Sequence, residues 1–330
     1  MKFSFLICTR NSARVLHEVI NSIINQIDDE KDYEIIIADH KSTDSTLAVA
    51  REIVSKANID LIETPCSVSG KSPALVLGLN VATGDYVIVV DDDNILMPNY
   101  ILEAKEIVKR DQVGCVGAMG IIDPALVLPP WFSTFSGVYA IGLPPLPNST
   151  DTVWGAAALI SKKAWKKLKL SGFNFELNPA RESHSSPILI GGEDGELSAA
   201  IKMIGFDVFY SEKLKFIHKF EQSRLTEDYL LKNTFGSTRA VPLIDIYRLL
   251  IHDKYSYLPY IAWNMIIFKR IMGCILRIIK FRILQRNILV KYHRVRSSAL
   301  IQGYLDTNKS FRRIFGGLNQ LRKVSNSSAE

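Results

Sequence analysis

Apolar and polar positions along the first 115 residues follow a pattern that predicts strands and helices in turn. Short apolar runs, typical of buried strands, alternate with stretches in which apolar residues recur every three or four positions, typical of helices. The expected strands are Phe3–Cys8, Tyr33–Ala38, Asp60–Glu63, Tyr86–Val90 and Val113–Met119, and the expected helices are Ala13–Ile27, Ser45–Ala57, Pro73–Ala82 and Asn99–Lys109. This alternation predicts an α/β fold with a mixed, mainly parallel sheet flanked by helices.

The pattern changes after this region. Residues 123–150 are rich in Pro, Ser and Gly, and we expect a long loop over a site. Mixed strand and helix patterns return over 151–240, with a helix at Glu196–Ile204, which Gly205 ends, and a strand at Phe209–Ile217. Ligands of parallel α/β sheets bind at the carboxyl ends of strands, so polar residues at those ends are candidates for function.

The C-terminal part, 241–330, predicts a helical extension with a basic amphipathic helix. Tyr255–Phe268 carries no charge, and the four basic residues that follow share one side of a helical wheel, with isoleucines on most of the remainder. The basic residues are Lys269, Arg270, Arg277 and Lys280, and the isoleucines are Ile266, Ile267, Ile271, Ile275, Ile278 and Ile279. No charge-free run reaches the ~18 residues that span a bilayer. An interfacial membrane helix fits this pattern; the alternatives are a helix packed on its own domain and an oligomer interface.

Charge is unevenly divided along the 330 residues, whose formal net charge is +6. Residues 254–330 have a net charge of +13 and the remainder −7, which indicates a tail that meets a polyanion or an anionic membrane. The tail is rich in isoleucine and not in interleaved aromatic and polar residues, which favours lipid over nucleic acid.

The cysteines and the N-terminus indicate a cytoplasmic protein. Cys8, Cys66, Cys115 and Cys274 are scattered without a metal-binding spacing, so we expect reduced thiols. The apolar stretch that begins at Met1 is too short for a signal peptide, and we interpret it as the first strand.

Three consecutive aspartates, Asp91, Asp92 and Asp93, follow the apolar run Tyr86–Val90. Adjacent carboxylates repel one another by about 4 kcal/mol per pair at about 4 Å and an effective dielectric near 20, so a compensating cation is expected. Side chains of an extended segment alternate, so Asp91 and Asp93 would point one way and Asp92 the other. Such a pair could hold a hard divalent metal suited to carrying a phosphate; the alternative is a solvated acidic turn.

Further polar residues stand at the predicted ends of other strands. Thr9 and Arg10 follow the first strand, and Asp39 follows the second, where it could accept a hydrogen bond from a base or a ribose. His218 follows the strand Phe209–Ile217 and is either a metal ligand or an ordinary strand-end residue. No GxGxxG motif is present to indicate a dinucleotide site.

A second acidic cluster, Glu193 and Asp194, opens a predicted helix after the glycines Gly191 and Gly192. A carboxylate at a helix N-terminus is stabilised in its ionised form by free N–H groups and the helix dipole. A general base needs this ionised form at neutral pH, and the alternative is plain N-capping.

These elements, in this order, resemble the family 2 glycosyltransferases of the GT-A fold, over roughly residues 3–240. Cys8, Val76 and the pair His40-Lys41 depart from the family's usual residues, and all of them touch the expected donor pocket. The segments that carry the resemblance are Cys8–Asn11, Ile36–Asp39 with Ser42–Thr46, Gly70–Leu75 with Gly78, Ala82–Tyr86, Val90–Asn94, Trp154–Ala157 with Ser161–Leu168 and Gly172-Phe173, Gly192–Asp194 with Leu197 and Gly205, and His218, Arg224, Thr226, Tyr229 and Gly236.

The resemblance implies a Rossmann-like nucleotide-sugar-binding half at 1–120 and an acceptor-binding half at 121–240. It implies that Asp194 is the catalytic base and that Trp154 and Glu193 bind the acceptor, unless Trp154 belongs to the core. Asp93, Asp91 and His218 would ligate Mn2+ or Mg2+, with Asp92 outside the metal shell. The nucleotide-sugar site would comprise Thr9, Arg10, Asp39, Lys71, Asp91 and Asp92.

The resemblance also implies an inverting, metal-dependent hexosyltransferase of bacterial surface-polysaccharide synthesis. Its donor would be a nucleotide sugar, with UDP favoured, and its acceptor a hydroxyl of a glycan or a lipid-linked molecule. We expect a peripheral protein on the cytoplasmic face of the inner membrane, with a possible homo-oligomer through the C-terminal helices. Residues 123–150 and 178–190 could close over the substrates.

Two other readings remain at this point. Transfer to a polyprenyl phosphate needs no base, and the Glu193-Asp194 pair argues against it. The other is a non-enzymatic module that binds a metal, a nucleotide or a polyanion. A receiver-like signalling domain of this class has acids clustered after the first strand and a later Lys, and this chain has none there.

Overall fold

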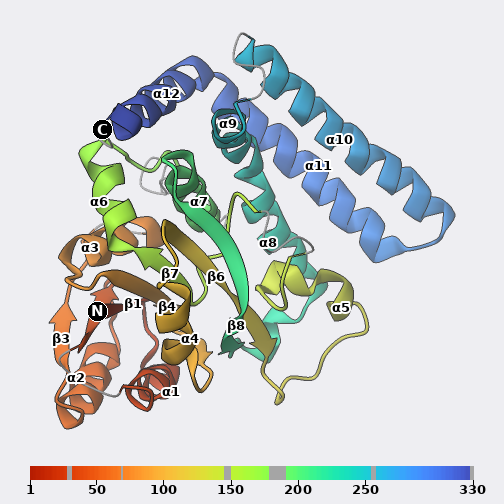
Figure 1. The fold of residues 1–330 in the computed structure, drawn as a ribbon. Coiled ribbons are helices and arrows are strands. Elements are labelled where there is room, and N and C mark those ends of the chain that lie inside the picture. Colours follow the sequence, from red (N-terminus) through yellow and green to blue (C-terminus); the bar gives the residue numbers. More distant parts are fainter. Residues whose placement is uncertain (28–31, 68–69, 145–149, 178–190, 254–257, 328–330) are drawn as a thin grey trace.

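The fold is known from a computed structural model that describes residues 1–27, 32–67, 70–144, 150–177, 191–253 and 258–327 (Figure 1). The region 178–190, which was expected to close over the substrates, lies outside the described residues. All four cysteines are described; Cys66, Cys115 and Cys274 are buried and Cys8 is partly buried.

The N-terminal strands and helices form as the hydrophobic pattern predicted, with ends that differ by three residues at most. Three of the four N-terminal strands are covered on both faces, so their residues are almost continuously buried, whereas the strand Asp60–Glu63 is exposed or only partly buried. The strands are β1 (Phe3–Thr9), β2 (Tyr33–Asp39), β3 (Asp60–Glu63) and β4 (Tyr86–Asp91), and the helices are α1 (Ala13–Ile24), α2 (Thr46–Lys56), α3 (Lys71–Val81) and α4 (Tyr100–Ile107).

One sheet of eight strands, in the order β3-β2-β1-β4-β7-β6-β8-β5, runs through the described residues. Four of its seven pairings are parallel, so the predicted mixed, mainly parallel sheet is confirmed. The remaining strands are β5 (Asn94–Leu96), β6 (Val113–Ile122), β7 (Ala158–Ser161) and β8 (Asp207–His218). Hydrophobic clusters cover both faces of the sheet and form the core.

Strand register brings the predicted donor residues to one edge of the sheet. Thr9 pairs with Asp39 across β1 and β2, and Cys8 pairs with Asp91 across β1 and β4. Because these strands are parallel, their carboxyl ends lie side by side, as the sequence predicted.

The segment 123–150 is not a structureless loop, which corrects the sequence expectation. It contains a short helix α5 (Phe132–Phe135) and a 3₁₀ helix η2 (Ser136–Tyr139). Phe132, Phe135 and Tyr139 are buried in a separate cluster with residues after β8, including Phe220. Aromatic burial therefore fixes this segment against the second half of the chain; 145–149 lie outside the described residues.

Helices of the second half pack beside the sheet and around the end of β8 (Figure 1). α7 begins three residues earlier than predicted, so Glu193 and Asp194 lie in its first turn. The elements are α6 (Lys162–Leu170), α7 (Glu193–Met203), the 3₁₀ helix η5 (Gln222–Arg224), α8 (Glu227–Arg239) and α9 (Val241–Ile251).

The tail is helical in its described part and consists of α10 (Pro259–Ile283), α11 (Asn287–Asn308) and α12 (Phe311–Ser327). α10 and α11 form an antiparallel hairpin, with α11 against α8 and α10 at the outer edge of the molecule (Figure 1). A Cβ on Gly303 would lie 2.1 Å from the Arg239 carbonyl oxygen, so a glycine is needed for α11 to approach α8. Among the described helices, none has the length and apolarity to cross a membrane.

Candidate active site

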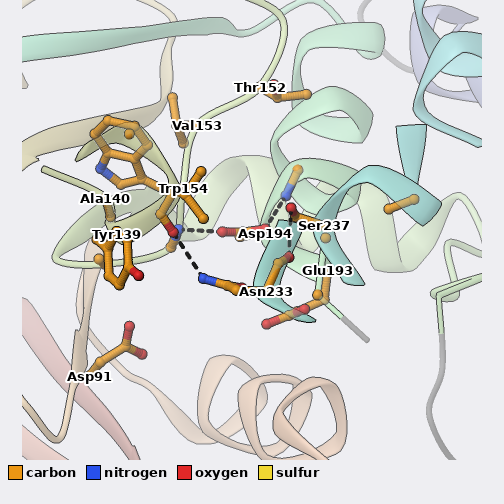
Figure 2. Close-up of a pocket in the computed structure, with 18 of the residues that line it drawn as sticks. Asp91, Tyr139, Ala140, Thr152, Val153, Trp154, Glu193, Asp194, Asn233 and Ser237 are labelled. Carbon is orange, nitrogen blue, oxygen red and sulfur yellow. Dashed lines mark hydrogen bonds between the residues drawn. The ribbon is translucent and has the colours of Figure 1, made fainter. Parts of the chain in front are cut away.

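A cavity of about 470 Å3 joins the ends of the central strands to the helices of the second half. Figure 2 shows Asp91 on one side of this cavity, with Glu193 and Asp194 across from it. Its volume lies within the range of small-molecule sites. Its charged lining residues are Lys71, Asp91, Glu193, Asp194, His218, Arg224 and Arg248. The two acidic clusters singled out in the sequence, about a hundred residues apart, therefore share one site.

Each aspartate of the run has its own protein partner. The chain turns at Asp92 and Asp93, so the run is not extended as expected, and the three side chains have different partners. Asp91 forms an ion pair with Lys71 at 2.5 Å. Asp93 Oδ1 lies 3.4 Å from His218 Nε2, and Asp93 Oδ2 lies 3.1 Å from Arg224 Nη1. These cations relieve the repulsion between the carboxylates.

Opposing effects set the protonation of Asp93 and His218. Burial acts to raise the pKa of Asp93, but the hydrogen bond and charge of His218, together with Arg224 and Lys71, lower it to about 2. Burial acts to lower the pKa of His218, while Asp93 and the Tyr139 carbonyl oxygen, 2.8 Å from Nδ1, raise it. The Tyr139 carbonyl also fixes the orientation of the ring, so Nε2 faces Asp93.

Asp92 is directed to the loop after β1 and away from Asp91 and Asp93. Its Oδ2 accepts hydrogen bonds from Thr9 Oγ1 at 2.8 Å, from the Ser12 hydroxyl and from the Arg10 backbone N–H at 3.4 Å. Burial raises the pKa of Asp92. Thr9 is buried and Arg10 is exposed. Ser12, which sequence reasoning missed, thus joins Thr9 in holding Asp92 outside the Asp91–Asp93 pair.

Asp39 is buried and organises the turn after β2. It accepts hydrogen bonds from the Ser42 backbone N–H at 3.1 Å and the Ser42 hydroxyl at 2.5 Å. The Asn11 side chain accepts from the Thr43 N–H at 2.8 Å and joins this turn to the loop after β1. Thr9 and Asp39 therefore belong to one connected pair of loops at the strand ends, whereas their predicted contacts with a nucleotide stay a prediction.

Asp194 is held at the N-terminus of α7 by two backbone donors. Oδ2 accepts from the Gly155 N–H and Oδ1 from the Gly195 N–H, each at 2.7 Å. A Cβ on Gly155 would lie 3.2 Å from Asp194 Cβ, so a glycine permits this close approach. The carboxylate is thereby fixed in orientation beside the cavity, as a proton acceptor requires.

Glu193 precedes Asp194 in the same turn and also lines the cavity. Burial and the nearby Asp194 raise its pKa to about 7, against the opposing charge of Lys71. Lys71 thus lies between the two acidic groups of the cavity, with Asp91 as its direct partner and Glu193 close enough to raise its pKa.

Trp154 is both a core residue and a wall of the cavity. Its indole N–H donates to the Ala118 carbonyl at 2.9 Å, and its ring packs edge-on against Tyr210 with centroids 4.6 Å apart. It is only partly buried and lines the cavity. Trp154 therefore packs in the core and also faces the cavity, so both interpretations made from the sequence apply in part. Its contact with an acceptor stays a prediction.

Glu196, one turn after Glu193, is a buried carboxylate that sequence reasoning did not single out. It accepts from the backbone N–H groups of Glu176 and Leu177, each at 2.8 Å, and from the Tyr247 hydroxyl at 2.9 Å. Burial raises its pKa to about 7. The sequence signal that could have identified Glu196 is a charged residue at a position of α7 that faces the core. Glu196 ties the first turns of α7 to the segment before residue 178 and to α9.

A metal would use a small set of protein ligands. Within the described ranges, no three His, Cys, Asp or Glu side chains gather into a metal cluster. Mg2+ commonly takes one or two carboxylates and completes its shell with substrate phosphates and water. Asp91, Asp93 and the adjacent His218 supply oxygen and nitrogen donors of this kind at the edge of the cavity. The two carboxylates are donors suited to a metal that arrives with a phosphate, whereas both ring nitrogens of His218 have protein partners, Asp93 and the Tyr139 carbonyl.

Comparison with known proteins gives the family. Residues 4–169, half of the chain, match the family described as Glycosyl transferase family 2. A poly(ribitol-phosphate) beta-glucosyltransferase of Bacillus spizizenii is 32% identical over 113 residues, which are 34% of this chain and 18% of that protein. A dolichol-phosphate mannosyltransferase of Pyrococcus furiosus is 28% identical over 229 residues, 68% of this chain and 62% of that protein. The matched stretch spans about a fifth of the first curated relatives.

Solved structures give the same fold. Residues 1–349 of S. aureus TarS superpose with a TM-score of 0.52 at 15% identity, covering 100% of this chain and 91% of that one. The mannosyltransferase PcManGT of Pyrobaculum calidifontis, in complex with GDP-Man and Mn2+, superposes with a TM-score of 0.55 at 14% identity, covering 100% and 88%. The TarS fragment in complex with UDP-GlcNAc gives a TM-score of 0.50 at 16% identity, covering 100% and 92%. The predicted GT-A fold is thereby confirmed.

Proposed function

Because this chain belongs to glycosyl transferase family 2, we propose that it transfers a sugar from a nucleoside-diphosphate donor to a hydroxyl of a glycan or lipid-linked acceptor. One observation carries the proposal: Asp194, held in orientation by two backbone N–H groups, lies in the same cavity as Lys71 and the strand-end residue Asp91. The relatives that are named glycosyltransferases support the same activity.

Asp194 accepts the proton of the acceptor hydroxyl while the hydroxyl oxygen attacks the anomeric carbon of the donor sugar. The bond from that carbon to the diphosphate breaks, and the nucleoside diphosphate leaves with the bonding electrons. A single displacement of this kind inverts the anomeric configuration. The Gly155 and Gly195 N–H groups orient the carboxylate for this step and stay bonded to it.

The donor would bind at the ends of β1, β2 and β4, near Thr9, Arg10 and Asp39. Asp91, Asp93 and His218 would hold Mn2+ or Mg2+, which supplies positive charge to the leaving diphosphate. Lys71 and Arg224 are the cations of the cavity that lie beside these carboxylates and can attract the diphosphate. A uridine nucleotide is favoured, in line with the TarS complex with UDP-GlcNAc.

We also propose that the reaction serves a bacterial surface polysaccharide and takes place on the cytoplasmic face of the membrane. The poly(ribitol-phosphate) glycosyltransferases among the relatives and the basic tail support this setting. Thermal-shift measurements with UDP-, GDP- and dTDP-sugars would identify the donor, since a ligand stabilises the folded state by RT ln(1 + [L]/Kd).

The decisive test is Asp194→Asn. Turnover should fall by about 10²–10⁴-fold, the usual contribution of a general base, while donor affinity measured by calorimetry stays unchanged. Asp228→Asn is the matched control, because Asp228 also lies in the first turn of a helix but is exposed and outside the cavity. Unchanged turnover in Asp194→Asn would remove the proposed base.

Transfer to a polyprenyl phosphate is the second candidate, because the dolichol-phosphate mannosyltransferase matches 68% of this chain. A phosphate acceptor is already anionic and needs no base. The same variant separates the two functions: retained turnover with a polyprenyl phosphate and Asp194→Asn would favour this candidate.

A further inference from the structure

Helix α10 is attached to the rest of the protein through one face only. Trp263, Ile267 and Cys274 on this face are buried. The Trp263 indole N–H donates to the Pro242 carbonyl at 2.7 Å, and the ring stacks on Tyr304 of α11 with centroids 5.1 Å apart. These contacts fix the helix on α9 and α11, so the opposite face has a defined direction, away from the body.

That opposite face is apolar and exposed. Six large apolar side chains on it are each between 52 and 77% exposed, and their spacing of three, four, seven or eight residues gathers them within an arc of about 80° on a helical wheel. They are Ile261, Met265, Phe268, Leu276, Ile279 and Ile283, which we call the α10 stripe. At about 1.5 Å per residue the stripe is about 33 Å long. A continuous apolar surface of this length marks an interaction site.

Basic residues border the stripe. Lys269 and Lys280 are exposed and lie at one margin, and Arg282 and Arg286 are exposed near its C-terminal end. The segment Pro259–Ile283 contains no acidic residue. An apolar stripe with cationic margins is the arrangement of helices that lie in the plane of a membrane interface, with lysines and arginines at the level of anionic headgroups.

We propose that the α10 stripe docks on an anionic lipid surface, with α10 parallel to the membrane plane. Charge decides between lipid and a second copy of this chain. A symmetric α10–α10 contact would bring the cationic margins of two copies together, with no acid on either helix to pair them. An anionic headgroup layer neutralises those margins while the acyl region receives the stripe.

The docked helix would also orient the cavity. Arg270 of α10 forms a bidentate ion pair with the buried Asp245 of α9, with both contacts at 2.7 Å. Asp245 also accepts from Arg248 at 2.8 Å, and Arg248 lines the cavity. The membrane surface and the acceptor side of the cavity are therefore joined through one helix, α9. This step rests on the proposed transfer to a lipid-linked acceptor, whereas docking itself does not.

Vesicle flotation of the full chain, without donor or acceptor, tests the docking. The protein should float with phosphatidylcholine vesicles that contain phosphatidylglycerol, and much less with phosphatidylcholine alone. The double variant Phe268→Ser with Ile279→Ser should lose flotation. Leu170→Ser with Val127→Ser is the matched control, because these exposed residues lie on other parts of the surface. Equal flotation of the stripe variant and its control would overturn the proposal.

A second pair of variants tests the charge argument. Lys269→Gln with Lys280→Gln should weaken partition by about fivefold per lysine, and added salt should remove this difference. Lys163→Gln with Lys166→Gln on α6 removes the same charge from an exposed site elsewhere and should have no effect. Light scattering in the absence of lipid completes the test. A dimer that the stripe variant abolishes, together with no flotation of the unchanged protein, would assign the stripe to a second copy.

The failure of docking and the failure of the proposed reaction are distinguishable. Flotation is measured without substrates, and the Asp194→Asn assay uses soluble donor. A protein that floats but transfers no sugar loses only the proposed function, and a protein that transfers sugar but does not float loses only the docking surface.

Discussion

Replacement of the buried Glu196 by Gln should change how the stability of this protein depends on pH. Glu196 is fully buried, and burial raises its pKa from 4.5 to about 7. Below pH 4.5 the carboxyl is protonated in both the folded and the unfolded chain. As the pH rises toward 7, the unfolded chain releases this proton first, so unfolding becomes more favourable. The stability that Glu196 contributes is therefore fully present below pH 4.5 and is lost as the pH rises through about 7.

The magnitude follows from the two ends of this range. Each tenfold change in an ionisation constant is worth about 1.4 kcal/mol, so the interval from 4.5 to about 7 corresponds to about 3 kcal/mol in the free energy of unfolding. Glutamine does not titrate and lacks this dependence. Its NH2 group faces one of the donors whose hydrogen bonds Glu196 accepts, and this mismatch subtracts a pH-independent amount of about 1–3 kcal/mol from the stability of the variant.

Denaturant unfolding at pH 5 and pH 8, for the unchanged protein and for Glu196→Gln, measures the effect. The stability of the unchanged protein minus that of Glu196→Gln should fall by about 2.5 kcal/mol from pH 5 to pH 8, because about 0.8 kcal/mol of the effect is already lost at pH 5, and the difference should approach or pass zero. Glu193, whose pKa is also raised to about 7, contributes equally to both proteins and cancels. Glu52→Gln is the control, because Glu52 is exposed and pairs only with Lys56 one turn away. Parallel pH profiles for the unchanged protein and Glu196→Gln would refute the role assigned to burial.

Three further predictions concern the cavity. Gly155→Ala should reduce turnover by up to about 10²-fold without weakening donor binding, because the added Cβ would lie 3.2 Å from Asp194 Cβ and displace the carboxylate. Steady-state kinetics measure turnover and calorimetry measures donor binding, and unchanged turnover would contradict the packing argument. Chelation by EDTA should abolish transfer, and Mn2+ or Mg2+ should restore it; full activity in EDTA would exclude the proposed metal. Asp93→Asn should weaken donor binding about tenfold or more. Asp92→Asn should have little effect, because the amide oxygen of the new asparagine can still accept hydrogen bonds from Thr9 and Ser12. Equal losses of donor affinity in the two variants would show that both aspartates face the donor.

The first half of the fold could be predicted because its signals are local. β3 begins and ends at the predicted residues, and β1, β2 and β4 each extend one residue further than predicted. Parallel strands buried on both faces give continuous apolar runs, and the helices between them give a clear period. β5, with three residues, is too short to show any period, and the sequence analysis missed it.

The contacts of the site were not local and could not be predicted from one sequence. Pattern and resemblance brought Asp91, Asp93 and Asp194 forward as candidates, and the structure places them on one cavity or at its edge. The partners that neutralise the aspartates lie far along the chain: Lys71 before them, and His218 and Arg224 more than a hundred residues after. The sequence analysis assumed that a metal must neutralise the charge of the three aspartates, and it did not consider that these protein cations could do so.

The tail shows the same limit. Its helical pattern and cationic margin were visible in the sequence, but the isoleucines did not reveal which of them face the protein. Ile267 is buried and Ile266 and Ile271 are partly buried, whereas Ile279 is exposed. The position of α9 and α11 decides this division. It moves the exposed apolar surface to residues such as Phe268 and Leu276, which the sequence analysis did not place on the apolar face. The boundary predicted near residue 240 stays a prediction.

The position of the aspartate run between β4 and β5 has a topological consequence. These strands are consecutive in the chain, yet β7, β6 and β8 separate them in the hydrogen-bonded order of the sheet. β4 and β5 are therefore connected twice, by hydrogen bonds through β7, β6 and β8 and by the covalent link Asp92-Asp93, and the two connections together form a closed ring. A ring has no free end at which an added or lost residue can be absorbed. An inserted residue would have to be absorbed by a longer turn or a β-bulge; otherwise it would slide β5 along β8, and a slide by one residue would exchange the two faces of β5. The length of the run is thus constrained by the closure of the ring, independently of its charge.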